Sequence, residues 1–343
     1  MRFGLFGSAT ARHGGPDVDS GLGYKQFIDY NIEAEALGYH STFLVEHHFS
    51  GAGQVSASLS LLTWLAAKTR TLRLGTAVLV LPWHNPVLLA EQAATIDLLS
   101  GGRLDFGVGK GYRHNEFSGF CIPIEEAEAR FGECLDVVMK SWTSKERFSH
   151  RGKYWSFADI IVEPPTAQKP HPPMWMAAGS PNSIRQVAER GYNLLLDQFA
   201  ALETIGERVA WFKAEVEKRG RAFDPLEVGV ARAFYVAKDK ADKEAALEQR
   251  LAAQRHFAAL SKAADGTQSK ASIMAFSDTR EASEEAALYG TPDEIALKLE
   301  KLQKLGVDYV LLNGGGLAHE SLRRFARELM PAFADGSRMR EVG

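Results

Sequence analysis

Short apolar runs alternate with amphipathic stretches along almost the whole chain. The runs rich in β-branched and aromatic residues cover 2–7, 40–46, 71–81, 103–108, 173–178, 192–197, 226–236 and 307–313. Stretches with helical spacing follow them, at 22–37, 57–69, 86–99, 125–144, 181–190, 201–219, 239–260, 292–305 and 318–333. Strands that alternate with helices predict a parallel sheet, and eight such units close most naturally into a barrel. We expect an α/β fold, a (β/α)8 TIM barrel, with a doubly wound open sheet as the alternative.

Two segments depart from this alternation. Residues 147–172 precede the fifth strand and predict a small hairpin that turns near Gly152, followed by a proline-rich connector. Residues 261–290 follow the seventh strand and its helix, and a polar connection of this length is typical of a mobile lid or a surface excursion. No linker rich in Pro, Gly or Ser divides the chain, so we expect a single domain over residues 1–343.

Composition and charge exclude several classes of protein. The 343 residues are 45% hydrophobic, which is enough for a large core, and the net charge is only -3. Without a basic run, neither nucleic-acid nor anionic-membrane binding is expected. Cys121 and Cys134 form no metal-ligand spacing and no disulfide framework. Since we find neither a signal peptide nor an apolar run of about 20 residues, we expect a cytoplasmic protein.

The second predicted strand ends in a carboxylate and two histidines, Glu46, His47 and His48. Barrel enzymes build their active sites at this end of the strands, and an imidazole there can move a proton near neutral pH. A structural histidine pair explains the motif equally well when it is taken alone. Neighbouring residues of a strand point to opposite faces, so His47 and His48 are poorly placed to share a metal ion. We expect no metal site.

Two turns after neighbouring strands indicate an anion site. Lys110 lies in a Gly-x-Gly-x-Gly turn after the fourth strand, where backbone N–H groups and its charge could face a phosphate. That spacing is not the fingerprint of a dinucleotide site. Ser180 and Ser183 open the helix after the fifth strand, and a helix N-terminus binds anions, although ordinary capping explains them too. Together the two turns predict a phosphate pocket.

Several motifs follow one another in a fixed order along nearly the whole chain. They are residues 46–49 (EHHF), 75–82 (GTAVLVLP), 85–86 (Asn-Pro) with Glu91, 102–109 (GRLDFGVG), 172–180 (PPMWMAAGS) and 290–292 (Gly-Thr-Pro). Each motif is weak by itself, but the ordered set resembles the bacterial luciferase-like flavin-dependent monooxygenase family. The fold of that family is a TIM barrel, in agreement with the fold expected from the strands.

The resemblance implies a role for each candidate residue. His47 matches a base beside the flavin ring, and we expect His48, its neighbour in the motif, to take part in catalysis. Glu46 and Glu116 are expected among the residues that contact the cofactor. Ala77 and Val78 match a non-proline cis peptide under that ring. The expected contacts at the phosphate end of FMN are Lys110, which replaces an arginine of many members, the backbone amide of Tyr112, and Gly179, Ser180 and Ser183. Gly179 stands where the luciferases have a glutamate, and Glu116 where they have an acid.

The resemblance also implies an activity. Reduced FMN from a separate NAD(P)H:flavin reductase would react with O2, and one oxygen atom would enter a small, apolar organic substrate through a flavin hydroperoxide. Residues 261–290 would form the lid, and a homodimer would pair through the second and third helices. Three alternatives stay open: a deazaflavin-dependent oxidoreductase of the same fold, a non-catalytic flavin-binding protein and a metal-dependent hydrolase.

Overall fold

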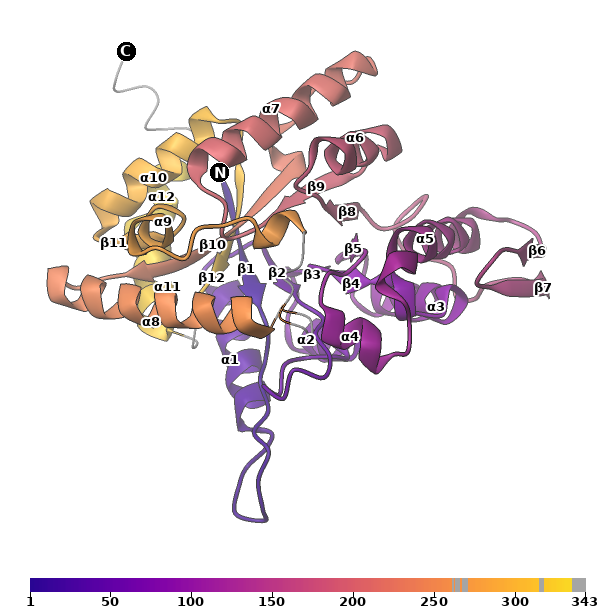
Figure 1. The fold of residues 1–343 in the computed structure, drawn as a ribbon, viewed down its shortest axis with the longest axis horizontal. Coiled ribbons are helices and arrows are strands. Elements are labelled where there is room, and N and C mark those ends of the chain that lie inside the picture. Colours follow the sequence, from indigo (N-terminus) through magenta and orange to yellow (C-terminus); the bar gives the residue numbers. More distant parts are fainter. Residues whose placement is uncertain (261, 263–265, 267–270, 315–317, 335–343) are drawn as a thin grey trace.

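Parallel strands form a closed barrel in the computed structural model, which describes residues 1–260, 262, 266, 271–314 and 318–334 (Figure 1). Around the barrel, eight strands follow in the order β10, β12, β1, β2, β3, β5, β8 and β9, and the pairing of β9 with β10 closes the ring. Their bounds are β1 Arg2–Gly7, β2 Ser41–Leu44, β3 Arg73–Thr76, β5 Leu104–Gly109, β8 Met174–Ala177, β9 Asn193–Leu196, β10 Val228–Val236 and β12 Tyr309–Asn313. Two short strands, β4 Leu79–Val80 and β11 Leu288–Gly290, lengthen the ring beside β5 and β10. The TIM barrel predicted from the sequence is confirmed.

Helices cover the outside of the barrel, as the amphipathic stretches predicted. Their bounds are α1 Leu22–Ala36, α2 Ser58–Lys68, α3 Pro86–Leu99, α5 Ala127–Thr143, α6 Pro181–Arg190, α7 Leu202–Lys218, α8 Lys240–Leu260, α10 Pro292–Lys304, α11 His319–Glu328 and α12 Met330–Phe333. The sequence analysis missed two short helices, α4 His114–Gly119 and α9 Arg280–Glu285. Each has only six residues, too few for a helical period to stand out. No helix in the part of the chain that the structure describes is long and apolar enough to cross a membrane.

Aromatic side chains fill the inside of the barrel below its carboxyl-terminal mouth. Phe43, Trp175 and Tyr309 are buried there, with ring centroids 5.7 to 6.3 Å apart in edge-to-face arrangements. Gly75 makes room for this cluster, because a Cβ atom at that position would lie 2.4 Å from the Phe43 ring. The packed interior gives the mouth of the barrel a solid floor.

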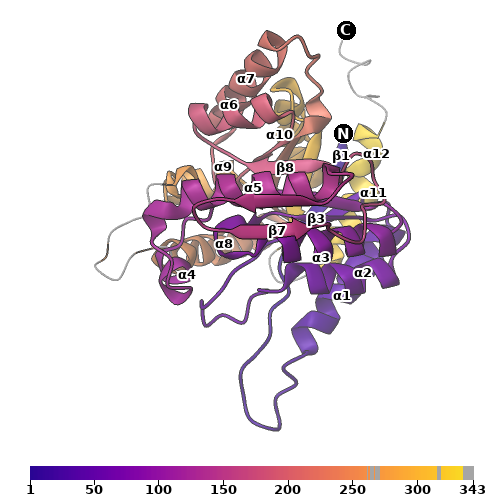
Figure 2. The ribbon, with the colours of Figure 1, turned by 90° about the vertical axis from the view of Figure 1, so that its right-hand side faces the viewer.

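The hairpin predicted before the fifth barrel strand is present as β6 Phe148–Arg151 and β7 Ser156–Ile160, an antiparallel pair. It lies along α5, on the outside of the barrel (Figure 2). Glu133 of α5 holds it there, because its carboxylate accepts hydrogen bonds from the His150 ring and from the backbone amides of Tyr154 and Trp155. The insertion therefore lies against the barrel wall.

The carboxyl-terminal end of the segment predicted as a lid, residues 261–290, has regular secondary structure. Residues 280–285 form α9, and 288–290 form β11, which pairs with β10 and is buried. Because the segment is polar, the sequence did not predict the three-residue strand β11. Positions 261, 263–265 and 267–270 lie outside the described residues. The lid prediction therefore concerns only the segment between α8 and α9.

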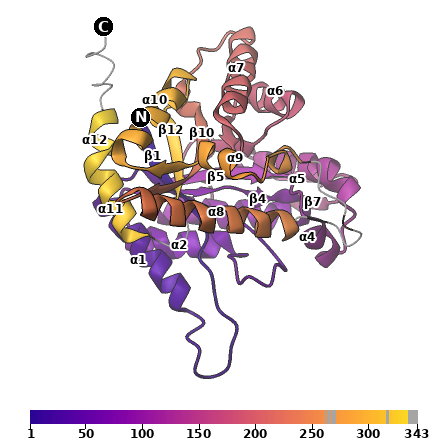
Figure 3. The same ribbon diagram turned by 60° about the vertical axis from the view of Figure 1, so that its left-hand side comes forward.

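Two long elements flank the mouth of the barrel. The loop between β1 and α1 extends far from the body of the protein (Figure 1), and Thr10 of this loop pairs with Gln54 of the loop after β2. The carboxyl-terminal end of α8 points toward α4 (Figure 3). There Phe257 contacts the ring of Tyr112, with centroids 6.3 Å apart. Segments far apart in the sequence thus meet around one opening.

Candidate functional site

A cavity of about 600 Å³ opens at the carboxyl-terminal ends of the barrel strands. Most of the site residues predicted from the sequence line it: Glu46, His47, Ala77, Val78, Lys110, Tyr112, Glu116, Gly179, Ser180 and Ser183. His48 is the one predicted residue that does not. Residues from strands β1 to β12 meet here because parallel strands of a barrel end at the same face.

Ala77, Val78 and Gly109 give the cavity an apolar lining, which we call its floor. The peptide bond between Ala77 and Val78 is cis, as the resemblance predicted. Gly109 lies against it, since a Cβ atom there would be 2.5 Å from Val78 Cγ2. Thr76 Oγ1 joins the two strands beneath by donating to the Gly107 carbonyl oxygen over 2.7 Å. A planar ring fits such a floor, so these residues are compatible with a flavin.

His47 and Glu116 form a hydrogen-bonded pair that lines the same cavity. His47 Nδ1 donates to Glu116 Oε1 over 2.9 Å, and the same oxygen accepts the backbone N–H of His48 over 3.0 Å. Burial lowers the pKa of the His47 imidazole, although the Glu116 carboxylate opposes this shift and the charge of Arg113 adds to it. A neutral imidazole with Nδ1 bound in this way keeps the lone pair of Nε2 for a proton. The pair has the geometry of a general base and the acid that orients it.

Glu46 is the centre of a separate network. Its buried carboxylate accepts hydrogen bonds from the His48, Trp83 and His84 rings and from the backbone amide of Val80, over 2.8 to 3.0 Å. Burial by itself would raise the pKa of Glu46, but the hydrogen bonds of His48 and His84 outweigh it and lower the pKa to about 2. Glu46 therefore fixes the loop that carries His47.

His48 faces away from the cavity. Besides its bond to Glu46, its ring packs against Phe120 and Trp83, at centroid distances of 4.9 and 5.7 Å. The catalytic role predicted for His48 finds no support in this position, which suits a positioning residue. The two imidazoles point to different carboxylates, and the described residues contain no group of three or more His, Cys, Asp or Glu side chains suited to a metal ion.

Lys110 lies at the rim where phosphate binding was predicted. Its Nζ is 2.6 Å from Glu128 Oε2, and both side chains are more than half exposed. A phosphate would have to compete with Glu128 for this ammonium group. Tyr112, two residues on, is largely buried, and burial raises the pKa of its phenol to about 12.

Ser180 and Ser183 cap α6, as the alternative of ordinary capping proposed. The Ser180 amide donates to Ser183 Oγ over 3.1 Å, and the two hydroxyl oxygens are 2.8 Å apart. Gly179 precedes them at a place with no room for a side chain: a Cβ atom would be 2.4 Å from Ser272 Oγ. A side chain at this position would therefore require Ser272 to move.

Arg113 was missed by the sequence analysis. It precedes α4, lines the cavity and is only 1% exposed. Its sequence neighbourhood gave no signal, because an arginine after a glycine-rich turn is usually on the surface.

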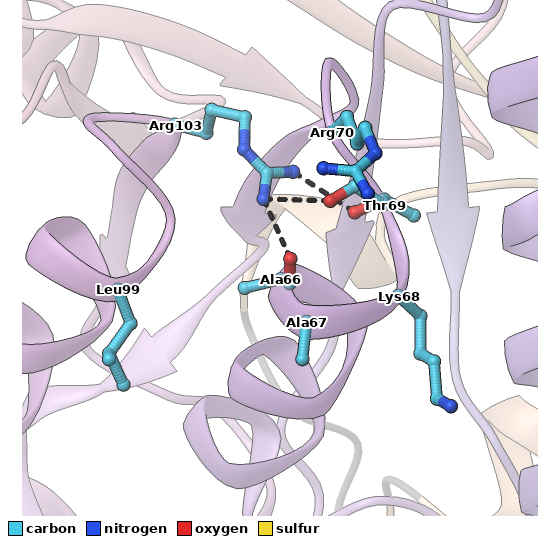
Figure 4. Close-up of a pocket in the computed structure, with 7 residues that line it drawn as sticks. All are labelled: Ala66, Ala67, Lys68, Thr69, Arg70, Leu99 and Arg103. Carbon is cyan, nitrogen blue, oxygen red and sulfur yellow. Dashed lines mark hydrogen bonds between the residues drawn. The ribbon is translucent and has the colours of Figure 1, made fainter.

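A second, smaller cavity of about 290 Å³ lies at the opposite end of the barrel, where β3 and β5 begin (Figure 4). Arg103 spans it and donates to the carbonyl oxygens of Ala66, Thr69 and Leu72. Since backbone carbonyls occupy this guanidinium group, the second cavity holds the ends of α2 and β3 together and is not a reaction site.

Comparison with known proteins identifies the family. The sequence model of luciferase-like monooxygenases matches residues 1–309. The chain belongs to the luciferase-like monooxygenase family. It is 28% identical over 332 residues to the oxygenase component of a flavin-dependent trigonelline monooxygenase from Acinetobacter baylyi, covering 91% of each chain. It is 27% identical over 348 residues to an FMNH2-dependent dimethylsulfone monooxygenase from Pseudomonas putida, covering 92% of this chain and 93% of that one.

The solved structure of a monooxygenase from Streptomyces bottropensis has the same fold. It superposes with a TM-score of 0.84 and 25% identity, covering 97% of this chain and 100% of the other. The family predicted from the motifs is confirmed, and so is the class of enzyme, a flavin-dependent monooxygenase. The individual roles of the site residues stay predictions.

Proposed function

We propose that this luciferase-like monooxygenase is the oxygenase component of a two-component system that takes reduced FMN from a separate reductase and inserts one atom of O2 into a small organic substrate. The observation that carries the proposal is the His47–Glu116 pair, which opens on a cavity floored by the cis peptide of Ala77 and Val78. FMN, when bound reduced, supplies the electrons that activate O2.

The two ends of the cavity suit the two ends of FMN. The apolar floor would hold the ring, and Lys110, the Tyr112 amide and the α6 N-terminus would hold the phosphate. The hydroxyls of Ser180 and Ser183 are within reach of each other and can turn toward an anion at little cost. Lys110 can leave Glu128, because an exposed ion pair contributes only about 0.2–1 kcal/mol.

His47 would take or return a proton at Nε2 while Glu116 holds Nδ1. The depressed pKa of His47 keeps the imidazole neutral near pH 7, as a base requires. The reaction must also be shielded from water. Phe257 and residues 271–273 line the cavity, which supports the proposal that these residues cover the bound flavin.

The proposal includes partners and a location. The reductase supplies reduced FMN and O2 is the second substrate, and the two free cysteines, Cys121 and Cys134, suit the reducing cytoplasm.

We also propose a homodimer through α2 and α3. Large apolar side chains are exposed on these neighbouring helices: Trp64, Leu88, Leu98 and Leu99.

A deazaflavin-dependent hydride transfer is the second candidate. One relative in the comparison is an F420-dependent glucose-6-phosphate dehydrogenase of Amycolatopsis mediterranei, and the same barrel could accept either ring. A non-catalytic flavin-binding role is disfavoured by the ordered His47–Glu116 pair, which binding alone does not need.

The test is an anaerobic titration of the purified protein with reduced FMN and with reduced deazaflavin, followed by O2 and a panel of small carbonyls, terpenes and organic acids. We expect tight binding of FMNH2 and an oxygenated product. His47→Ala should bind FMNH2 as the wild type does and lose about 100-fold in product formation, a usual contribution of a general base.

His13→Ala is the matched control, since His13 is exposed in the β1–α1 loop and should change neither value. An alanine variant at His47 with wild-type product per FMNH2 would contradict the role of this base. Preference for the deazaflavin, with no use of O2, would replace the proposal by the second candidate.

A further inference from the structure

One buried guanidinium group at the cavity, that of Arg113, has two nitrogen atoms that make no hydrogen bond. The Nε and Nη1 atoms of Arg113 are fully buried and make no hydrogen bond. The side chain lines the cavity and is 1% exposed. Buried charges are normally both paired and hydrogen-bonded, because leaving their N–H groups unsatisfied is costly. A bound ligand with hydrogen-bond acceptor atoms would satisfy these N–H groups of Arg113.

The neighbouring carboxylate does not fill that role. Arg113 Nη1 lies 3.8 Å from Glu116 Oε1, too far for a hydrogen bond. The same oxygen already accepts from His47 Nδ1 and from the backbone of His48. Glu116 thus balances part of the charge of Arg113 and leaves its Nε and Nη1 atoms without a hydrogen bond.

Other buried arginines of the barrel show the difference. Arg208 donates to the Asp197 carboxylate over 2.7 Å, and Arg250 donates to the backbone carbonyl oxygen of Ser283 over 3.1 Å. Arg232 also has unpaired N–H groups, but it does not line the cavity. Within the described residues, Arg113 is therefore the unsatisfied guanidinium that a ligand in the cavity can reach.

The surroundings of Arg113 select the kind of acceptor. The guanidinium lies over the rings of Phe257 and Tyr112, at 5.3 and 5.9 Å from their centroids. Aromatic walls exclude water and strengthen a charged contact, and the planar donor fork of arginine matches a carboxylate or sulfonate with two parallel bonds. The site therefore favours an oxyanion over a neutral carbonyl.

We propose that the substrate is a small organic acid whose carboxylate or sulfonate binds Arg113, so that its carbon skeleton lies beside His47. This inference rests on the proposed oxygenase function, and it changes the expected substrate from an apolar molecule to an apolar body with one anionic group. Arg113 would fix the orientation of the substrate, and Glu116 would hold both this guanidinium and the base in register.

The experiment compares benzoate with benzamide, which have the same shape and differ in charge. Binding of each is measured by isothermal titration calorimetry to the wild type, with and without saturating FMN. We expect benzoate to bind at least about 10-fold more tightly than benzamide. Arg113→Gln should weaken benzoate about 10- to 100-fold and leave benzamide and FMN unchanged, while Arg113→Lys keeps part of the preference.

Arg185→Gln is the matched control, because it removes a half-exposed positive charge on α6 and should leave benzoate binding unchanged. Equal affinity of the wild type for benzoate and benzamide would overturn the inference, and this comparison needs no variant to fold. Loss of FMN binding together with benzoate binding in Arg113→Gln would also overturn it, by making Arg113 a cofactor ligand. Failure of the wild type to bind FMNH2 in the anaerobic titration would instead refute the proposed function.

Discussion

Replacement of Glu46 by glutamine tests whether one buried carboxylate holds the histidine motif in place. The side chain is 2% exposed and accepts hydrogen bonds from three rings and one backbone amide. Glutamine has the same shape, but its NH2 group would face donors where the carboxylate has acceptors. We expect Glu46→Gln to destabilise the protein at neutral pH.

The magnitude follows from the pKa of Glu46, which is about 2 in the folded protein against 4.5 for the free side chain. One pKa unit corresponds to about 1.4 kcal/mol, so the ionised carboxylate stabilises the fold by about 3 kcal/mol at pH 7. Because the folded pKa is the lower one, this stability is complete above pH 4.5 and is lost as the pH falls toward 2. By linkage about 1 kcal/mol remains at pH 3.

Urea denaturation of both proteins at pH 7, 4.5 and 3 measures this difference. Glutamine does not titrate, so the gap in free energy of unfolding between wild type and Glu46→Gln should shrink from about 3 to about 1 kcal/mol between pH 7 and pH 3. Glu125→Gln, at an exposed position, should change stability by less than about 0.5 kcal/mol at each pH. A gap that does not depend on pH, or a variant as stable as the wild type, would refute the reasoning.

Three further predictions concern the base, the phosphate and the dimer. Glu116→Gln removes the carboxylate that raises the pKa of His47, so the acidic limb of the pH profile of kcat/KM should move to lower pH. Product formation should fall about 10- to 100-fold. An acidic limb at the wild-type pH would show that His47 acts without Glu116. Lys110→Gln should weaken FMN about fivefold and leave riboflavin unchanged in fluorescence titrations, whereas equal losses would place Lys110 away from the phosphate. Trp64→Glu puts a charge on the exposed face of α2 and should yield monomers in sedimentation velocity; a persistent dimer would assign the interface elsewhere.

Much of the fold was readable from the sequence because its signals are local. Each barrel strand is a short apolar run, and each long helix carries its own apolar face and caps. The capping box of Thr291 and Glu294 and the left-handed Gly38 after α1 are examples. The sequence analysis did not predict β11, because three residues in a polar segment are too few to show an alternating hydrophobic pattern. Only their pairing with β10 makes them a strand.

The sequence by itself determined that a carboxylate and two histidines end the second strand. Its resemblance to the family predicted the cis peptide, and its two turns after neighbouring strands predicted an anion site at the same end of the barrel. Only the tertiary structure decided which of them reach the cavity. His47 faces it and His48 does not, because Glu46, Trp83 and Phe120 form a pocket for the second ring. Arg113 became a buried, unsatisfied charge only when Phe257 of α8, far away in the sequence, packed over it. Burial and hydrogen bonding between distant segments have no local pattern, and they set the chemistry of this site.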